Sequence, residues 1–178
     1  MNSKQTYREE VDAKRTLQIR ENARELPQAC GDFLRAIAVT TGTLTRLAYS
    51  IDLKTFFQFL HTERVAFAQK EIPLLNDQDL SQLTQADLTA YTEYLTYYLK
   101  TSEKNPDDDR VYINHDLAIK RKLCSIRAFY DYLFKNQRIP SNVTELVPLP
   151  KIHEKPILRL SREEMEKIDR KSTRLNSS

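Results

Sequence analysis

The sequence has 178 residues, 40% of them hydrophobic, with 28 Lys and Arg against 25 Asp and Glu and a formal net charge of +3. Nine Tyr and seven Phe are enough for a core, which excludes wholesale disorder. Only two glycines occur and alternating β-branched runs are absent, so the expected fold class is all-α. No apolar run approaches a membrane span and no signal peptide precedes Cys30 and Cys124, which predicts reduced thiols in a cytoplasmic protein without a membrane partner.

Three helices are expected in the first third of the chain. Residues 3–26 are highly charged and lack Gly and Pro, which predicts an exposed helix attached at one end. Pro27 suits the first turn of a second helix over 28–39. The third helix is expected over 43–63, where five apolar residues form a dense aromatic stripe that is typical of a core: Tyr49, Leu53, Phe56, Phe57 and Leu60.

Polar side chains gather at the start of the third expected helix. Thr43, Thr45 and Arg46 offer hydrogen-bond donors at a positively polarised helix N-terminus, where a phosphate is favourably bound. An ordinary helix cap would use the same residue types. Both interpretations stay open from these residues alone.

The middle of the chain is acidic, with nine acidic and four basic residues between 64 and 109. A helical turn is expected near Asp77, and Thr84 is expected to cap a helix over 85–101 that turns Tyr98 and Leu99 inward. A solvated loop follows over 102–113. Its three consecutive aspartates lack the ligand spacing of a calcium loop, and the three histidines show no metal-ligand spacing, so no metal site is expected.

The most informative stretch is residues 114–138, with six basic and two acidic residues. Its apolar residues recur at three- and four-residue steps and form one stripe of a helix: Ile119, Leu123, Ile126, Phe129, Tyr130 and Leu133. Lys120, Arg121, Ser125 and Arg127 are predicted to point away from that stripe. A helix with one core face and one basic face is suited to a DNA major groove, although a solvated bundle surface has the same pattern.

After residue 138 the sequence predicts a series of short segments. A turn near 142–146 ends the bundle, and three prolines predict an extended linker over 148–160. A capping box at 161–164 opens another helix, so a second domain is expected to start within 161–168. Residues 169–178, DRKSTRLNSS, match the translation of a short-read sequencing adapter and are interpreted as an artefact. Residues 1–26 form the charged helix and 27–147 the main domain.

Three stretches in this order resemble the tyrosine recombinases, the phage integrase family, in their core-binding domain. TLTRLAYSIDLKTFFQFL over 43–60 is similar to the family's Thr, Tyr, Asp-Leu, Phe pattern. KRKLCSIRAFYDYL over 120–133 is similar to its Arg-x-Leu-x-x-x-Arg-x-Phe-Tyr-x-Tyr-Leu helix, and the proline linker into LSREE resembles the entry to the catalytic domain. The match spans about residues 26–168 in element order and leaves the first charged helix outside the minimal pattern.

The resemblance implies a SAM-like bundle of four to five core helices, with an extra N-terminal helix and an extended C-terminal linker. It also implies binding to double-stranded DNA, through Thr43, Thr45, Arg46, Lys120, Arg121, Ser125 and Arg127. The parent enzyme would cleave and rejoin DNA through a phosphotyrosyl link, without metal or cofactor, and self-associate on DNA. This part would hold no catalytic residue and be inactive. The alternative is a standalone helical DNA-binding regulator or protein-interaction module.

Overall fold

The computed structural model describes residues 7–99 and 111–151, without the side chains of residues 98, 99, 111 and 112. The predicted linker beyond residue 151, the start of a second domain and the adapter-like tail lie outside the described residues. An all-α bundle is observed, as predicted, with one short pair of strands. Its helices and strands run in this order: α1 (Tyr7–Arg24), α2 (Gln28–Ala36), η1 (Ile37–Val39), α3 (Thr43–Glu63), α4 (Val65–Ala68), η2 (Ile72–Leu74), α5 (Asp77–Leu80), α6 (Gln85–Thr96), β1 (Tyr97–Leu99), β2 (Val111–Ile113), α7 (Asp116–Lys135) and η3 (Val143–Leu146).

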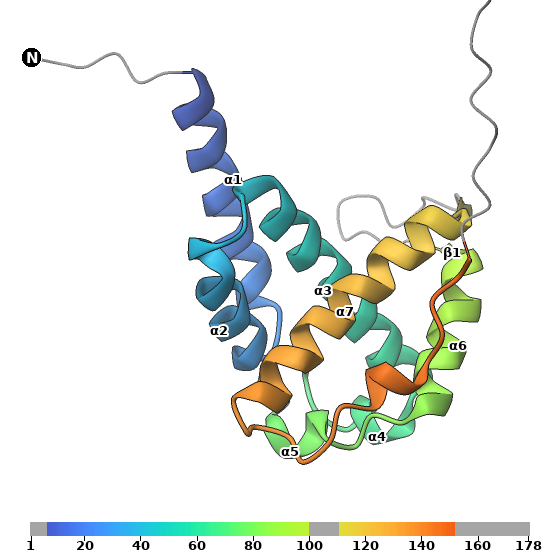
Figure 1. Ribbon diagram of the computed structural model, residues 1–178. Helices are drawn as coiled ribbons and strands as arrows, with labels where there is room; N and C mark the ends of the chain where they lie inside the picture. Colours follow the sequence, from blue (N-terminus) through green and yellow to red (C-terminus); the bar gives the residue numbers. More distant parts are fainter. Residues whose placement is uncertain (1–6, 100–110, 152–178) are drawn as a thin grey trace, which may run out of the picture.

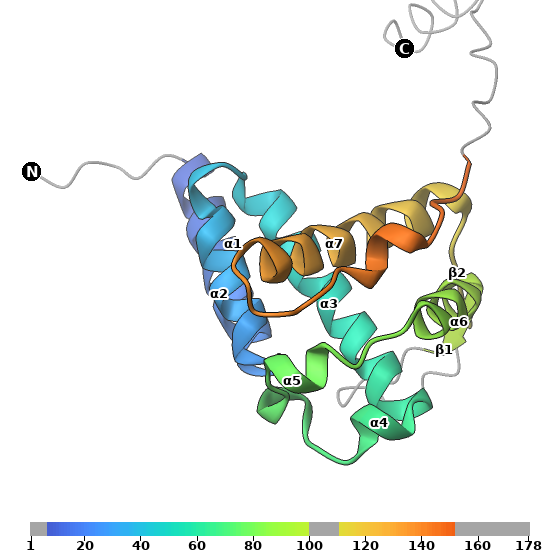
Figure 2. The same ribbon diagram turned by 60° about the horizontal axis from the view of Figure 1, so that its bottom comes forward.

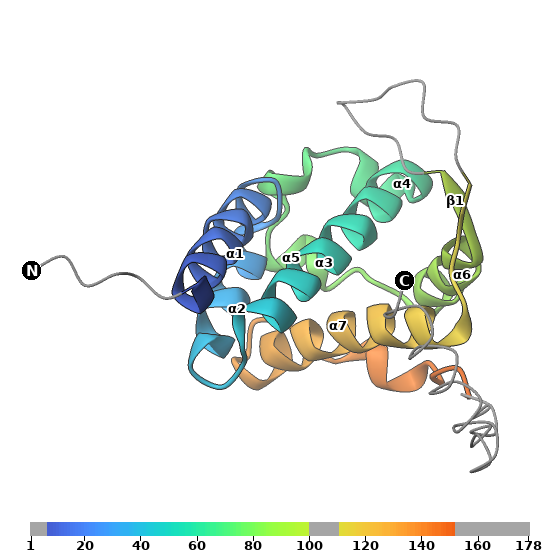
Figure 3. The ribbon, with the colours of Figure 1, turned by 90° about the horizontal axis from the view of Figure 1, so that it is seen from above.

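The two longest helices cross in the centre of the molecule, with α7 in front of α3 (Figure 1). Helices α1 and α2 lie at one end of this pair, and α6 lies at the other end (Figure 3). The predicted stripe of α7 is buried in full, while Leu117, which falls off it, is exposed. The aromatic stripe of α3 faces the same core, as its spacing predicts.

Aromatic rings connect four helices in this core. Phe129 of α7 lies 5.6 Å from Phe33 of α2 and 6.2 Å from Phe57 of α3, centroid to centroid. Phe56 lies 5.0 Å from Tyr91 of α6 in an edge-on arrangement. Neighbouring residues of one stripe therefore join α3 to different helices, Phe57 to α7 and Phe56 to α6.

The helix predicted over 85–101 is wrong at its end. It stops at Thr96, and residues 97–99 pair antiparallel with 111–113, with Tyr97 opposite Ile113. Aromatic and β-branched residues in both segments favour a strand pair. Asn114 Nδ2 also donates to the Leu95 carbonyl at 2.7 Å, which satisfies an acceptor left open at the helix end.

The expectation of a first helix attached at one end is also wrong. Helix α1 lies alongside α3 and α2 (Figures 1 and 3), with Ile19 and Asn22 buried. Asn22 Nδ2 donates to Ser50 Oγ at 2.9 Å, and Thr43 Oγ1 donates to Asp12 Oδ1 at 2.5 Å. Polar contacts thus hold α1 on the bundle together with Ile19, and a search for apolar periodicity does not detect such contacts.

Replacing Phe56 with alanine should lower the free energy of unfolding by about 3 to 5 kcal/mol, because a fully buried ring is lost between α3 and α6. A circular-dichroism melt measures the change. The partly exposed Phe134→Ala is the control and should melt close to the parent. Equal melting of all three proteins would contradict the assignment of Phe56 to the core.

Candidate nucleic-acid interface

The centre of the predicted interface is a buried carboxylate on α3. Asp52 is fully buried and accepts hydrogen bonds from three side chains of α7. Arg121 binds it with both terminal nitrogens, at 2.5 and 2.8 Å, and Ser125 Oγ donates to it at 2.6 Å. Lys122 Nζ lies 3.3 Å from Oδ1. Two cations and a hydroxyl therefore neutralise one buried anion and fix α7 on α3.

This network changes the interpretation of the basic face of α7. Ser125 is fully buried, so the expectation that it points away from the core is wrong. The reason is Asp52, which gives a polar side chain a partner inside the interface. Arg121 is 48% exposed, so its outer edge remains accessible while its nitrogens bind Asp52.

Arg127, the second arginine of the expected DNA-binding set, binds backbone instead. Its Nε donates to the Thr144 carbonyl at 3.1 Å, and its Nη2 donates to the Val147 carbonyl. Both acceptors belong to η3 and the start of the predicted linker, which runs back beside α7 (Figure 2). Arg127 therefore fixes the direction in which the chain leaves the bundle.

The polar start of α3 is also partly occupied. The Thr43 hydroxyl donates to Asp12, and the Arg46 Nε donates to the Leu34 carbonyl at 3.0 Å. The hydrogen bond from Thr43, with the charges of Arg15 and Arg8, lowers the pKa of Asp12. Thr45 is exposed, and it lies seven residues before Asp52, hence on the same side of α3.

The structure thus leaves only part of the expected DNA-binding residues available to a ligand, because the others have partners within the molecule. Of the six cations in residues 114–138, five have intramolecular partners: Arg121, Lys122, Arg127, Lys135 and Arg138. Within the described residues, Lys120 has no hydrogen bond or ion pair. The polar groups left without a partner or partly accessible are the exposed Thr45, the half-buried Lys120 and the outer edge of Arg121.

Sequence reasoning missed Asp52 and Asp12. Asp52 stands inside the aromatic stripe of α3, next to Leu53, where a charged residue is buried only with a partner. The three consecutive cations over 120–122 could have indicated that a basic side chain of the later helix pairs with Asp52. Asp12 gave no such signal, because α1 carries charges on all sides.

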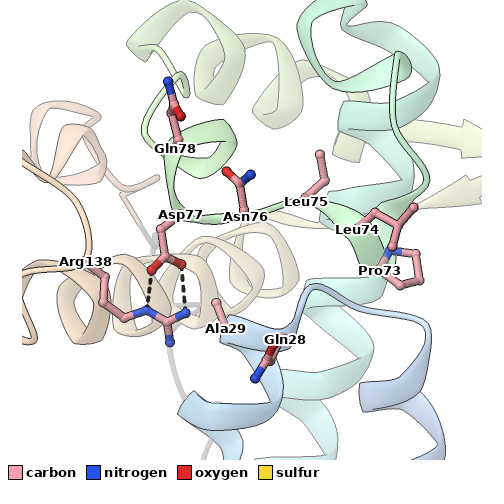
Figure 4. A pocket seen from close by; sticks show the side chains of 9 residues that line it. All are labelled: Gln28, Ala29, Pro73, Leu74, Leu75, Asn76, Asp77, Gln78 and Arg138. Atoms are coloured by element: carbon pink, nitrogen blue, oxygen red, sulfur yellow. Dashed lines mark hydrogen bonds and ion pairs between the residues drawn. The ribbon is translucent and has the colours of Figure 1, made fainter.

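A hollow of about 530 Å³ lies near α5 (Figure 4). It is lined by nine residues: Gln28, Ala29, Pro73, Leu74, Leu75, Asn76, Asp77, Gln78 and Arg138. Arg138 binds Asp77 through two hydrogen bonds of 2.8 Å and also binds Asp32 at 3.0 Å. The charges in this hollow therefore satisfy one another. They join α2, α5 and the chain after α7, which indicates a structural role.

The described part of the chain contains neither a metal-binding cluster nor a membrane-spanning helix. No three or more His, Cys, Asp or Glu side chains there lie close enough to hold a metal ion. Within the same residues, no helix combines the length and apolar character needed to cross a membrane.

Comparison with known proteins supports a relationship to the tyrosine recombinases. The chain is 29% identical over 126 residues to a protein named tyrosine recombinase XerC from Caldanaerobacter subterraneus subsp. tengcongensis, covering 68% of this chain and 33% of that protein. Two Leptospira interrogans proteins of the same name, from serovars copenhageni and Lai, are 30% identical over 105 residues, which cover 59% of this chain and 25% of each. The match thus spans a third or less of these relatives. No protein-family model and no solved structure matches.

Replacing Asp52 with alanine should cost about 3 kcal/mol or more of unfolding free energy, because Lys122 would stay in the interface without its anion. Chemical denaturation measures the change. The control is Asp131→Ala, which removes a surface pair with Lys135 and should cost less than about 1 kcal/mol. Similar costs for both variants would show that the Asp52 network does not hold α7 on α3.

Replacing Arg127 with glutamine should loosen η3 without unfolding the bundle. The amide hydrogens of residues 143–147 should exchange about tenfold faster, since each lost hydrogen bond contributes about 1 kcal/mol. Mass spectrometry of the exchanged peptides measures the rate, with Lys120→Gln as a control on the same helix. Unchanged exchange in this segment would remove Arg127 as its anchor.

Proposed function

We propose that residues 27–147 are the DNA-binding, core-binding domain of a site-specific tyrosine recombinase, with a SAM-like helical arrangement. The observation that carries the proposal is the similarity over 126 residues to proteins named tyrosine recombinases. In the structure, the two stretches that resemble the family pattern, residues 43–60 of α3 and 120–133 of α7, are joined by the pair of Asp52 and Arg121. Double-stranded DNA is the proposed partner and the cytoplasm the proposed place of action.

The proposed DNA-facing surface extends from the start of α3 to the first turns of α7. Thr45, Lys120 and the outer edge of Arg121 are its accessible polar groups. Figure 1 shows the chain after η3 leaving beside the first turns of α7, on the same side. A domain following that chain would be placed near DNA bound to this surface, as two halves of a clamp require.

We propose that this part of the protein binds DNA and does not cleave it. Tyr130 is buried, its hydroxyl donates to the Leu80 carbonyl, and burial raises its pKa well above the usual range. Tyr91 is also buried, and Tyr49 stacks on Phe33. The proposed cleavage and rejoining of strands through a phosphotyrosyl link, and self-association on DNA, belong to the full-length recombinase.

Binding should be weak, because few cations are free to displace counterions from DNA, and its fall with salt should have a slope set by that small number of phosphate contacts. The test is a gel shift with a duplex of about 30 base pairs over a salt series. Lys120→Gln should weaken binding severalfold at low salt and reduce the slope of log affinity against log salt by about 1. Loss of one phosphate contact explains both effects.

Lys135→Gln is the matched control, because it removes the same charge near the other end of α7, where Lys135 pairs with Asp131. It should bind like the parent. No retention of duplex by the parent at low salt would overturn the proposed function. Equal losses in the two variants would move the DNA surface away from Lys120. A suicide substrate should trap no covalent adduct with this chain.

A further inference from the structure

Helix α1 is held on the bundle by a mixed interface. Ile19, which belongs to the hydrophobic core, and Asn22 are its buried residues. Asn22 binds Ser50, and Glu25, one residue after α1, binds Lys54 at 2.7 Å. Polar contacts exchange readily with water and contribute little net free energy, whereas apolar burial is lost outright on separation. A single polar contact of α1 can therefore change its partner while Ile19 keeps the helix on the core.

The upper end of α1 reaches the start of α3. Figure 1 shows α1 extending past the first turn of α3, and Asp12 accepts the hydrogen bond of Thr43, the first residue of α3. The residue before it, Gly42, has no side chain to cap this helix. The hydroxyl of the first residue of α3 therefore binds an anion supplied by the chain itself, at the helix end where the N–H groups have no partner within the helix and the dipole is positive.

We infer that α1 is an autoinhibitory element, in which the Asp12 carboxylate occupies the position of a DNA phosphate at the start of α3. The inference rests on the proposed function. One carboxylate and one phosphate oxygen would compete for the same Thr43 hydroxyl and the same helix end. With Asp12 bound to Thr43, the surface is reduced to Thr45, Lys120 and the edge of Arg121.

The charges beside Asp12 favour an exchange for phosphate. Arg15 Nη1 lies 3.2 Å from Asp12 Oδ1, and the charge of Arg8 also acts on this carboxylate. Once Asp12 leaves Thr43, both arginines stand at the rim of the DNA surface. The same helix then supplies phosphate ligands where it previously supplied a competing anion.

The test compares Asp12→Asn with Glu10→Gln in the full chain, by gel shift on a duplex of about 30 base pairs at low salt. Both variants remove one negative charge from α1, but Glu10 is exposed and makes no hydrogen bond or ion pair within the described residues. Asp12→Asn should bind about three- to tenfold more tightly than the parent, because the charged competitor is gone. Glu10→Gln should change affinity by less than about twofold, as expected for a screened surface charge.

A second measurement separates competition at Thr43 from the release of Arg15. In the Thr43→Val background, the gain from Asp12→Asn should shrink to the size of the Glu10→Gln effect. A full gain in that background, or equal gains from Asp12→Asn and Glu10→Gln, would overturn the inference while leaving the proposed function intact. Weaker binding by Asp12→Asn would also overturn it. Failure of parent and variants alike to bind duplex would overturn the proposed function and the inference together.

Discussion

The structure depends on one buried carboxylate. Asp52 lies inside the interface of the two longest helices, and removing a charge from water is costly unless oppositely charged groups and hydrogen bonds replace the water. Arg121, Lys122 and Ser125 supply these groups from successive turns of α7. The requirement fixes the rotation and the position of α7 along α3, which apolar packing alone specifies less strictly.

The same requirement limits what α7 can offer to a nucleic acid. A cation that neutralises a buried carboxylate, or that holds the backbone of η3, contributes less to the field outside the molecule. Lys120 and the exposed edge of Arg121 are what remains of a helix with six basic residues in and just after it. For the proposed DNA-binding function, weak binding by this part alone is the physical consequence.

Helix α1 combines one apolar anchor with polar contacts. It is long and highly charged, yet it lies along α3 through the buried Ile19 and through individual hydrogen bonds. Such hydrogen bonds can change partners while the apolar residue stays in the core. Under the proposed autoinhibition, the contact of Asp12 with Thr43 controls whether the start of α3 can bind a phosphate.

Periodicity by itself determined the bounds of α3, the buried stripe of α7 and the all-α class, because burial of apolar side chains repeats with the helical turn and is written along the chain. The end of α6 was predicted wrongly, since strand pairing with residues 111–113 is a contact between distant segments. Partners of charged side chains were likewise decided only by tertiary structure. No residue near Arg127 or Thr43 in the sequence predicts Val147 or Asp12 as its partner, because an ion pair or hydrogen bond has no period and depends on where the fold places the second group.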